Sequence, residues 1–101
     1  MRSRYAAYAT GNVQHIVRTT HPSGPQFQHN NENWMAEIAT FCETNRFFSL
    51  EIHEHSATNS IGRVHFTAHL QSGRTPVSID EKSLFYLVDE RWLYWGQEET
   101  D

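Results

Sequence analysis

The chain has 101 residues, a length typical of one domain that can bury its own core. Only 38% of the residues are hydrophobic, but 13% are aromatic, and each ring buries enough area to replace several aliphatic groups. The net charge of −4, with acidic and basic residues interspersed, argues against a protein that binds nucleic acid through a basic face.

Cysteine usage and hydropathy give further expectations. Cys42 is the only cysteine, so the chain cannot form an internal disulfide, and a free thiol is typical of a reducing compartment. No apolar run approaches the roughly 20 residues that span a bilayer, and the N-terminus carries no secretory segment. We therefore expect a soluble, cytoplasmic protein without a membrane partner.

The first half has the spacing of helices. Tyr5 and Ala9 predict a short first helix that ends at Gly11, and Asn12 can cap a second helix. The prolines and glycine of residues 21–25 end that second helix. The residues expected to face the core are Tyr5, Ala6 and Ala9 in the first helix, with Tyr8 as a further candidate, and Val13, Ile16 and Val17 in the second.

A third helix follows a polar loop. Asn30 or Asn31 can cap it, because an asparagine oxygen can accept a hydrogen bond from a free N–H of the first turn. Its apolar residues recur at intervals of three and four, which places them on one face. They are Trp34, Ile38, Phe41 and Cys42.

From residue 47 onward the hydrophobic period changes to two, which is typical of strands. The first expected strand begins at Phe47, the second contains the alternating residues Val64 to Leu70, the third covers residues 75–88, and the fourth covers residues 91–95. Residues 56–61, 72–73 and 89–90 are expected turns. The inward-facing residues are predicted to be Phe48, Leu50 and Ile52 in the first strand and Val64, Phe66, Ala68 and Leu70 in the second.

Helices followed by a meandering sheet predict an α+β fold, in which a curved antiparallel sheet packs around the N-terminal helices as a cone. The curvature leaves a hollow between sheet and helices, which is a common place for a ligand.

The chain resembles the central domain of the YchJ family. The shared pieces are Arg2-Ser3-Arg4-Tyr5 with Tyr8 and Gly11, Thr20-His21-Pro22, Trp34, Leu50 and Ile52, the run from Gly62 to Ala68, the run from Glu81 to Phe85, and Trp92-Leu93-Tyr94. The resemblance implies a fold similar to nuclear transport factor 2 over residues 1–101 as a single domain. It does not imply an activity, because the molecular role of that domain is not established.

The chain also departs from the family pattern. Members usually carry a short cysteine-rich zinc motif of the SEC-C type, and this sequence contains none, so we expect neither that zinc site nor a cofactor. Because the sequence starts directly at Arg2-Ser3-Arg4-Tyr5, we expect the usual zinc segment to be absent. Leu84 stands where the family usually has a second arginine.

Five residues are candidates for a ligand pocket: Arg4, Tyr8, His21, Trp34 and Glu81. We expect Arg2, Arg4 and Glu81 to form an ion-pair network, since a buried arginine needs a carboxylate. Alternatively, one arginine binds an anionic ligand such as a carboxylate or phosphate. His21 is a potential general base with Glu81 as its orienting carboxylate, but it can equally cap a helix end or contact a backbone carbonyl.

Four histidines fall on expected strands. His65 and His69 share a face but lie about 13 Å apart along an ideal strand, too far to bind one metal ion by themselves. His53 and His55 are about 6.6 Å apart, and a site could be assembled with them across the sheet. A solvated polar sheet face is the favoured interpretation, and no metal ligand is predicted.

Trp92, Tyr94 and Trp95 make the last strand aromatic on both faces, so they are candidates for an interface with a protein partner or a second copy. The favoured function is a non-catalytic module that binds a protein or a small molecule. The alternative is a small cofactor-independent isomerase or hydrolase, with Glu81 or His21 as the acid–base group and Tyr8 as hydrogen-bond donor to an oxyanion.

Overall fold

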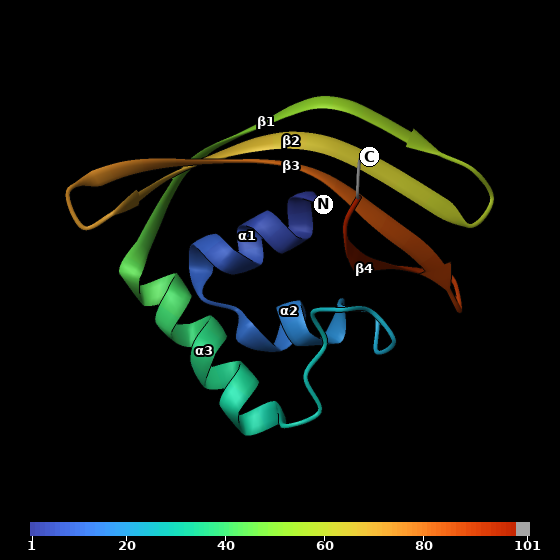
Figure 1. The fold of residues 1–101 in the computed structure, drawn as a ribbon, viewed down its shortest axis with the longest axis horizontal. Coiled ribbons are helices and arrows are strands. Elements are labelled where there is room, and N and C mark those ends of the chain that lie inside the picture. The colour runs from blue at the N-terminus through green and yellow to red at the C-terminus, as the bar shows by residue number, and fades with distance from the viewer. Residues whose placement is uncertain (99–101) are drawn as a thin grey trace.

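The computed structural model describes residues 1–98, so residues 99–101 of the expected domain lie outside the described part. Three helices precede four strands, and the sheet arches over the helices as the upper layer of the molecule (Figure 1). The elements are α1 (Arg2–Thr10), α2 (Val13–Arg18), α3 (Asn31–Thr44), β1 (Asn45–Ala57), β2 (Ile61–Ser72), β3 (Thr75–Val88) and β4 (Arg91–Gln97). The expected α+β fold is confirmed.

Local signals define both ends of the helices. The side chains of Asn12 and Asn30 accept hydrogen bonds from the backbone N–H groups of His15 and Asn33, so each asparagine caps its helix as expected. Gly11 ends α1 in the left-handed region at φ 73°, a conformation that glycine adopts without a steric cost.

The strands form an antiparallel meander in the order β1-β2-β3-β4. The predicted bounds of the third strand are confirmed, and Asp89 and Glu90 close the last hairpin with positive φ values of 48° and 65°. The first connection is shorter than the predicted turn at residues 56–61, because β1 continues to Ala57. The last strand continues two residues beyond its predicted end, to Gln97.

The prediction that Phe48 faces the core is wrong. The pairing of β1 with β2 shifts between Phe47 and Ser49, and this irregularity leaves Phe48 57% exposed, whereas Phe47 packs against the core. One extra residue in a strand reverses the side of every residue before it, which simple alternation does not foresee. Leu50 and Ile52 face inward as predicted.

The predicted face of α1 is also partly wrong, since Ala6 and Ala9 are exposed and the buried residues are Arg4 and Ala7. Two apolar clusters form the core. Ala7, Ile16, Trp34 and Ile38 hold the helices together, while Phe66, Ala68 and Leu70 form the inner surface of the sheet. The site described below lies between these two clusters and takes lining residues from both.

Among residues 1–98, no helix is long and apolar enough to cross a membrane.

Candidate functional site

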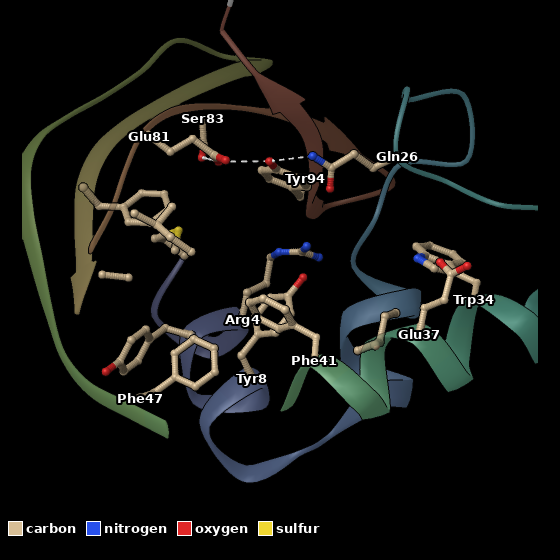
Figure 2. A pocket seen from close by; sticks show the side chains of 16 residues that line it. Arg4, Tyr8, Gln26, Trp34, Glu37, Phe41, Phe47, Glu81, Ser83 and Tyr94 are labelled. Carbon is tan, nitrogen blue, oxygen red and sulfur yellow. Dashed lines mark hydrogen bonds between the residues drawn. The ribbon is translucent and has the colours of Figure 1, made fainter. Parts of the chain in front are cut away.

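A cavity of about 300 Å³ opens between the helices and the inner face of the sheet. Its walls come from α1, α3, the loop between α2 and α3, and all four strands, and Figure 2 shows the side chains converging on it. The lining residues are Met1, Arg4, Tyr5, Tyr8, Gln26, Trp34, Glu37, Ile38, Phe41, Phe47, Phe66, Ala68, Ile79, Glu81, Ser83 and Tyr94. Most of them are apolar or aromatic, as in ordinary ligand sites.

The sheet side of the cavity carries a chain of hydrogen bonds. Tyr94 donates its hydroxyl proton to Oε2 of Glu81 at 2.9 Å, and the hydroxyl of Ser83 donates to the same oxygen. Nε2 of Gln26 donates to the Tyr94 oxygen at 3.3 Å (Figure 2). The carboxylate of Glu81 is therefore held in one orientation on the cavity wall, with two hydroxyl groups on one of its oxygens.

Arg4 supplies the opposite charge from the helical side. The Nη1 atom donates to the carbonyl of Ile16 at 3.1 Å and to the hydroxyls of Thr19 at 2.8 Å and Thr20 at 3.1 Å. The guanidinium carbon lies 4.4 Å from the centre of the Tyr94 ring. These contacts join α1 to the end of α2 and explain why a charged side chain is buried on the first helix.

The guanidinium of Arg4 is directed into the cavity (Figure 2). The three hydrogen bonds above all start from Nη1, and the group, which also carries N–H donors at Nε and Nη2, has the hydroxyl of Tyr8 as a further partner. Arginine keeps its charge at any physiological pH, so these donors favour an oxygen acceptor.

The expected ion-pair network of Arg2, Arg4 and Glu81 is wrong. No ion pair within residues 1–98 joins either arginine to Glu81, and Arg2 is exposed. Arg4 is satisfied by neutral oxygens and an aromatic ring instead, since the end of α2 places a carbonyl and two hydroxyls beside it. The cavity consequently separates a positive from a negative group.

Burial and charge perturb the groups around the cavity. Burial raises the pKa of Tyr94 strongly, and the nearby Glu81 carboxylate raises it further. Burial also raises the pKa of Tyr8, although the positive charge of Arg4 opposes this. Both phenols therefore remain protonated at neutral pH and can act as hydrogen-bond donors.

The structure places four of the five pocket candidates, Arg4, Tyr8, Trp34 and Glu81, on the cavity wall. His21 is not among the lining residues. Its backbone N–H donates to the carbonyl of Tyr94 at 2.8 Å, its Nδ1 accepts from the N–H of Ser23 at 3.0 Å, and its ring contacts Trp95 at 5.1 Å between centroids. His21 thus attaches the loop after α2 to β4, and Glu81 does not orient it.

The three interface candidates have different environments. Trp92 is 41% exposed, and Trp95 is half-buried against His21 and Tyr86. Tyr94 is only 5% exposed and lines the cavity, so its side chain is not available at the surface of this chain.

Sequence reasoning missed Gln26 and Ser83 as parts of the site. Ser83 is fully buried, and a serine at an inward position two residues after Glu81 was a usable signal for a hydrogen-bonded pair. Gln26 lies in a loop without periodicity, and only its distance from Tyr94 in the folded chain reveals its role.

Comparisons with known proteins identify relatives of this chain. Residues 1–96 match the family model described as YchJ, middle NTF2-like domain. A UPF0225 protein of Pectobacterium carotovorum is 34% identical over 93% of this chain and 61% of its own length. One from Serratia proteamaculans is 31% identical over 93% of this chain and 60% of its own length. The chain therefore spans about three fifths of the length of these relatives.

Solved structures agree with this assignment. A SEC-C motif containing protein from Rhodopseudomonas palustris superposes with a TM-score of 0.83 and 31% identity, over 100% of this chain and 76% of that one. A putative NTF2-like transpeptidase from Campylobacter jejuni, at 10% identity and a TM-score of 0.54 over 90% of both chains, shares the fold alone. The match over residues 1–96 establishes that this chain belongs to the YchJ family and contains its middle, NTF2-like domain.

Proposed function

We propose that the domain is a binding module whose cavity takes a small, largely apolar molecule with one polar end. The observation that carries this proposal is the pairing of Glu81 and Arg4 on opposite walls of one apolar cavity without a direct ion pair between them. Two opposite charges that face each other across an open space favour a ligand group that can hydrogen-bond to both of them.

The polar ends suggest what that group is. The Glu81 carboxylate accepts hydrogen bonds, whereas the guanidinium of Arg4 can only donate them. A ligand group with both a donor and an acceptor, such as an alcohol, an amide or a protonated acid, matches both walls. A dianion matches poorly, because Glu81 would repel it.

The size and lining of the cavity restrict the rest of the ligand. A volume of about 300 Å³ is at the lower end of the range for small-molecule sites. Trp34, Phe41 and Phe66 offer ring surfaces against which an apolar or aromatic body can pack.

The experiment is a binding screen by two-dimensional amide NMR with a library of small aromatic amides and alcohols. We expect selective shifts at cavity residues, and loss of those shifts in Ala68→Leu, which fills the cavity from the sheet side. Glu81→Gln should weaken binding of alcohols and amides at least tenfold, whereas Lys82→Gln, the neighbouring exposed position on β3, should not. The proposal fails if no compound shifts cavity resonances, or if Ala68→Leu leaves the shifts unchanged.

Native mass spectrometry of the purified chain provides an independent measurement. A molecule retained at one copy per chain and lost in Ala68→Leu supports the cavity and identifies its ligand. Turnover of a bound compound that disappears in Glu81→Gln would instead favour the isomerase or hydrolase alternative.

We also propose, as a second candidate, that the domain contacts a protein partner or a second copy in the cytoplasm. The exposure of Trp92 on the edge strand β4 supports this, because large exposed rings are typical of interface centres. Light scattering of the wild type and of Trp92→Gln tests it: a dimer that becomes monomeric in the variant supports the interface, and a wild-type monomer that captures no partner contradicts it.

A further inference from the structure

The outer face of the sheet, directed away from the helices (Figure 1), carries a compact cluster of three potential metal ligands. His53 comes from β1, His65 from β2 and Asp80 from β3, so three adjacent strands contribute one residue each. One ligand atom of each residue lies within 4.8 Å of the other two.

The register of the sheet produces this cluster. Thr67 pairs with Asp80 across β2 and β3, and Glu54 pairs with His65 across β1 and β2. Between Ile52 and Glu54 the register shifts, so His53 is an extra residue whose ring reaches over β2. Its centroid lies 4.7 Å from that of His65.

Hydrogen bonds already direct the ligand atoms toward one another. Nε2 of His65 lies 2.8 Å from Oδ1 of Asp80, and Nε2 of His53 lies 4.0 Å from Oδ2 of Asp80. The hydroxyl of Thr67 donates to Oδ2 of Asp80 at 2.8 Å and lies 2.7 Å from Nε2 of His53. Thr67 therefore holds both side chains close together, and its hydrogen bonds to these two atoms are exchanged for metal bonds when an ion binds.

We propose that His53, His65 and Asp80 bind a divalent first-row transition-metal ion such as Zn²⁺. Two imidazoles and a carboxylate are ligands that zinc and its neighbours accept, and three protein ligands leave room for water. In a tetrahedral zinc site the ligand atoms are about 3.3 Å apart, so small rotations of exposed side chains suffice to close the cluster. On binding, the ion takes the place of the hydrogen at Nε2 of His65, and the neutral imidazole carries its hydrogen on Nδ1 instead.

The charged groups next to the cluster determine how tightly we expect it to bind a metal ion. Lys82 pairs with His65 in the register and repels a cation, whereas Glu54, which pairs with His65 from the other side, attracts one. The site is open to water, with 39% of the His53 and 62% of the Asp80 side chain exposed. We therefore expect micromolar affinity rather than the tight binding of a closed structural zinc site.

The same face offers a matched control. His69 contacts Glu51 at 3.1 Å and Ser78 at 3.2 Å, so it has one carboxylate but no second histidine among its partners. It lies on the same strand as His65, with a similar partly exposed environment, and differs in lacking a third ligand.

The test is calorimetric titration of the untagged, chelator-treated chain with Zn²⁺. We expect one ion per chain, and at least a tenfold loss of affinity in both His65→Gln and Asp80→Asn. His69→Gln should stay within threefold of the wild type. Equal losses in His69→Gln, or no saturable binding of Zn²⁺ to the wild type, would overturn the proposal.

A second measurement locates the ion without a substitution. Substoichiometric Cu²⁺ should broaden amide resonances around residues 53, 65 and 80 first, because a paramagnetic ion relaxes nearby nuclei. Broadening spread evenly over the seven histidines of the chain would instead indicate adventitious binding and contradict the site. Because the cluster lies on the opposite face from the cavity, these results are independent of the pocket proposal.

Discussion

The two faces of the same strands have opposite characters. On β2, Phe66, Ala68 and Leu70 face the helices and are at least 93% buried, whereas His65 and His69 between them reach solvent. On β3, Glu81 points into the cavity while Asp80, the residue before it, joins the outer histidines. The alternation of inward and outward side chains along these strands thus places an apolar cavity on one face of the sheet and a polar cluster of potential ligands on the other.

The comparison shows how the same residue types act differently on each face. The inner carboxylate of Glu81 is held by two hydroxyl donors on an apolar wall, so it can recognise a ligand group. The outer carboxylate of Asp80 is exposed and lies beside two imidazoles, and this is the arrangement for which we propose a metal ion. Burial on the inner face and nitrogen ligands on the outer face make the difference.

The largest expected difference in stability is between substitutions at two adjacent positions of β2, one on each face of the sheet. Phe66→Ala should lower the free energy of unfolding by about 3–5 kcal/mol, because it removes a buried ring from the inner cluster. Thr67→Ala, on the outer face, should cost about 1 kcal/mol or less. Urea unfolding of both variants measures this, and similar losses at the two positions would contradict the assignment of faces.

Substitution of Arg4 tests whether a buried charged residue on the inner side contributes to the stability of the fold as a buried aromatic residue does. Arg4→Met should lower the free energy of unfolding by about 2–3 kcal/mol, since the hydrogen bonds that join α1 to the end of α2 are lost. Arg2→Met, on the same helix but exposed, is the control and should stay within about 0.5 kcal/mol of the wild type. Equal losses in a thermal or urea melt would mean that the buried contacts of Arg4 do not stabilise the fold.

The register shift between Phe47 and Ser49 in β1 can be tested by substituting two neighbouring phenylalanines. Phe47 packs its ring against Tyr5, Tyr8 and Phe41 at centroid distances of 5.6, 5.9 and 6.0 Å. We expect Phe47→Ala to cost about 2 kcal/mol and the exposed Phe48→Ala about 0.5 kcal/mol. If Phe48→Ala is the more destabilising in urea unfolding, the regular alternation of the strand would be correct and the shifted register wrong.

The smallest expected effect concerns alkaline pH. The folded chain holds the Tyr94 proton more tightly than the unfolded chain, so below pH 10 both states are protonated and stability is unaffected. Above pH 10 the unfolded state releases the proton first, and stability falls by up to about 1.4 kcal/mol per pH unit from this group.

Tyr94→Phe should therefore make the loss of stability above pH 10 less steep without abolishing it, because the pKa of Tyr8 is also raised. Urea unfolding between pH 8 and pH 11 measures the slope. A variant that declines as steeply as the wild type would exclude Tyr94 as the group responsible.

Much of the fold follows from local signals. The asparagine caps of α2 and α3, the bounds of β3 and the tight turn at Asp89 and Glu90 were predictable, because capping and turn chemistry act within a few residues. Alternation also predicted the inner face of β2. The errors at Phe48 and on α1 arose where a strand irregularity or a distant polar partner overrides the local period.

The candidate sites divide in the same way. The sequence by itself determined the residue types available, including an arginine and tyrosines on the first helix, a glutamate on an inward strand position and histidines on the outer positions. Only the tertiary structure decided their partners: it directed Arg4 to Thr19 and Thr20 rather than Glu81, and placed His53 beside His65 and Asp80. The physical reason is that caps and periodicity are local, whereas a cavity wall or a ligand cluster depends on cross-strand register and helix packing between residues far apart in the chain.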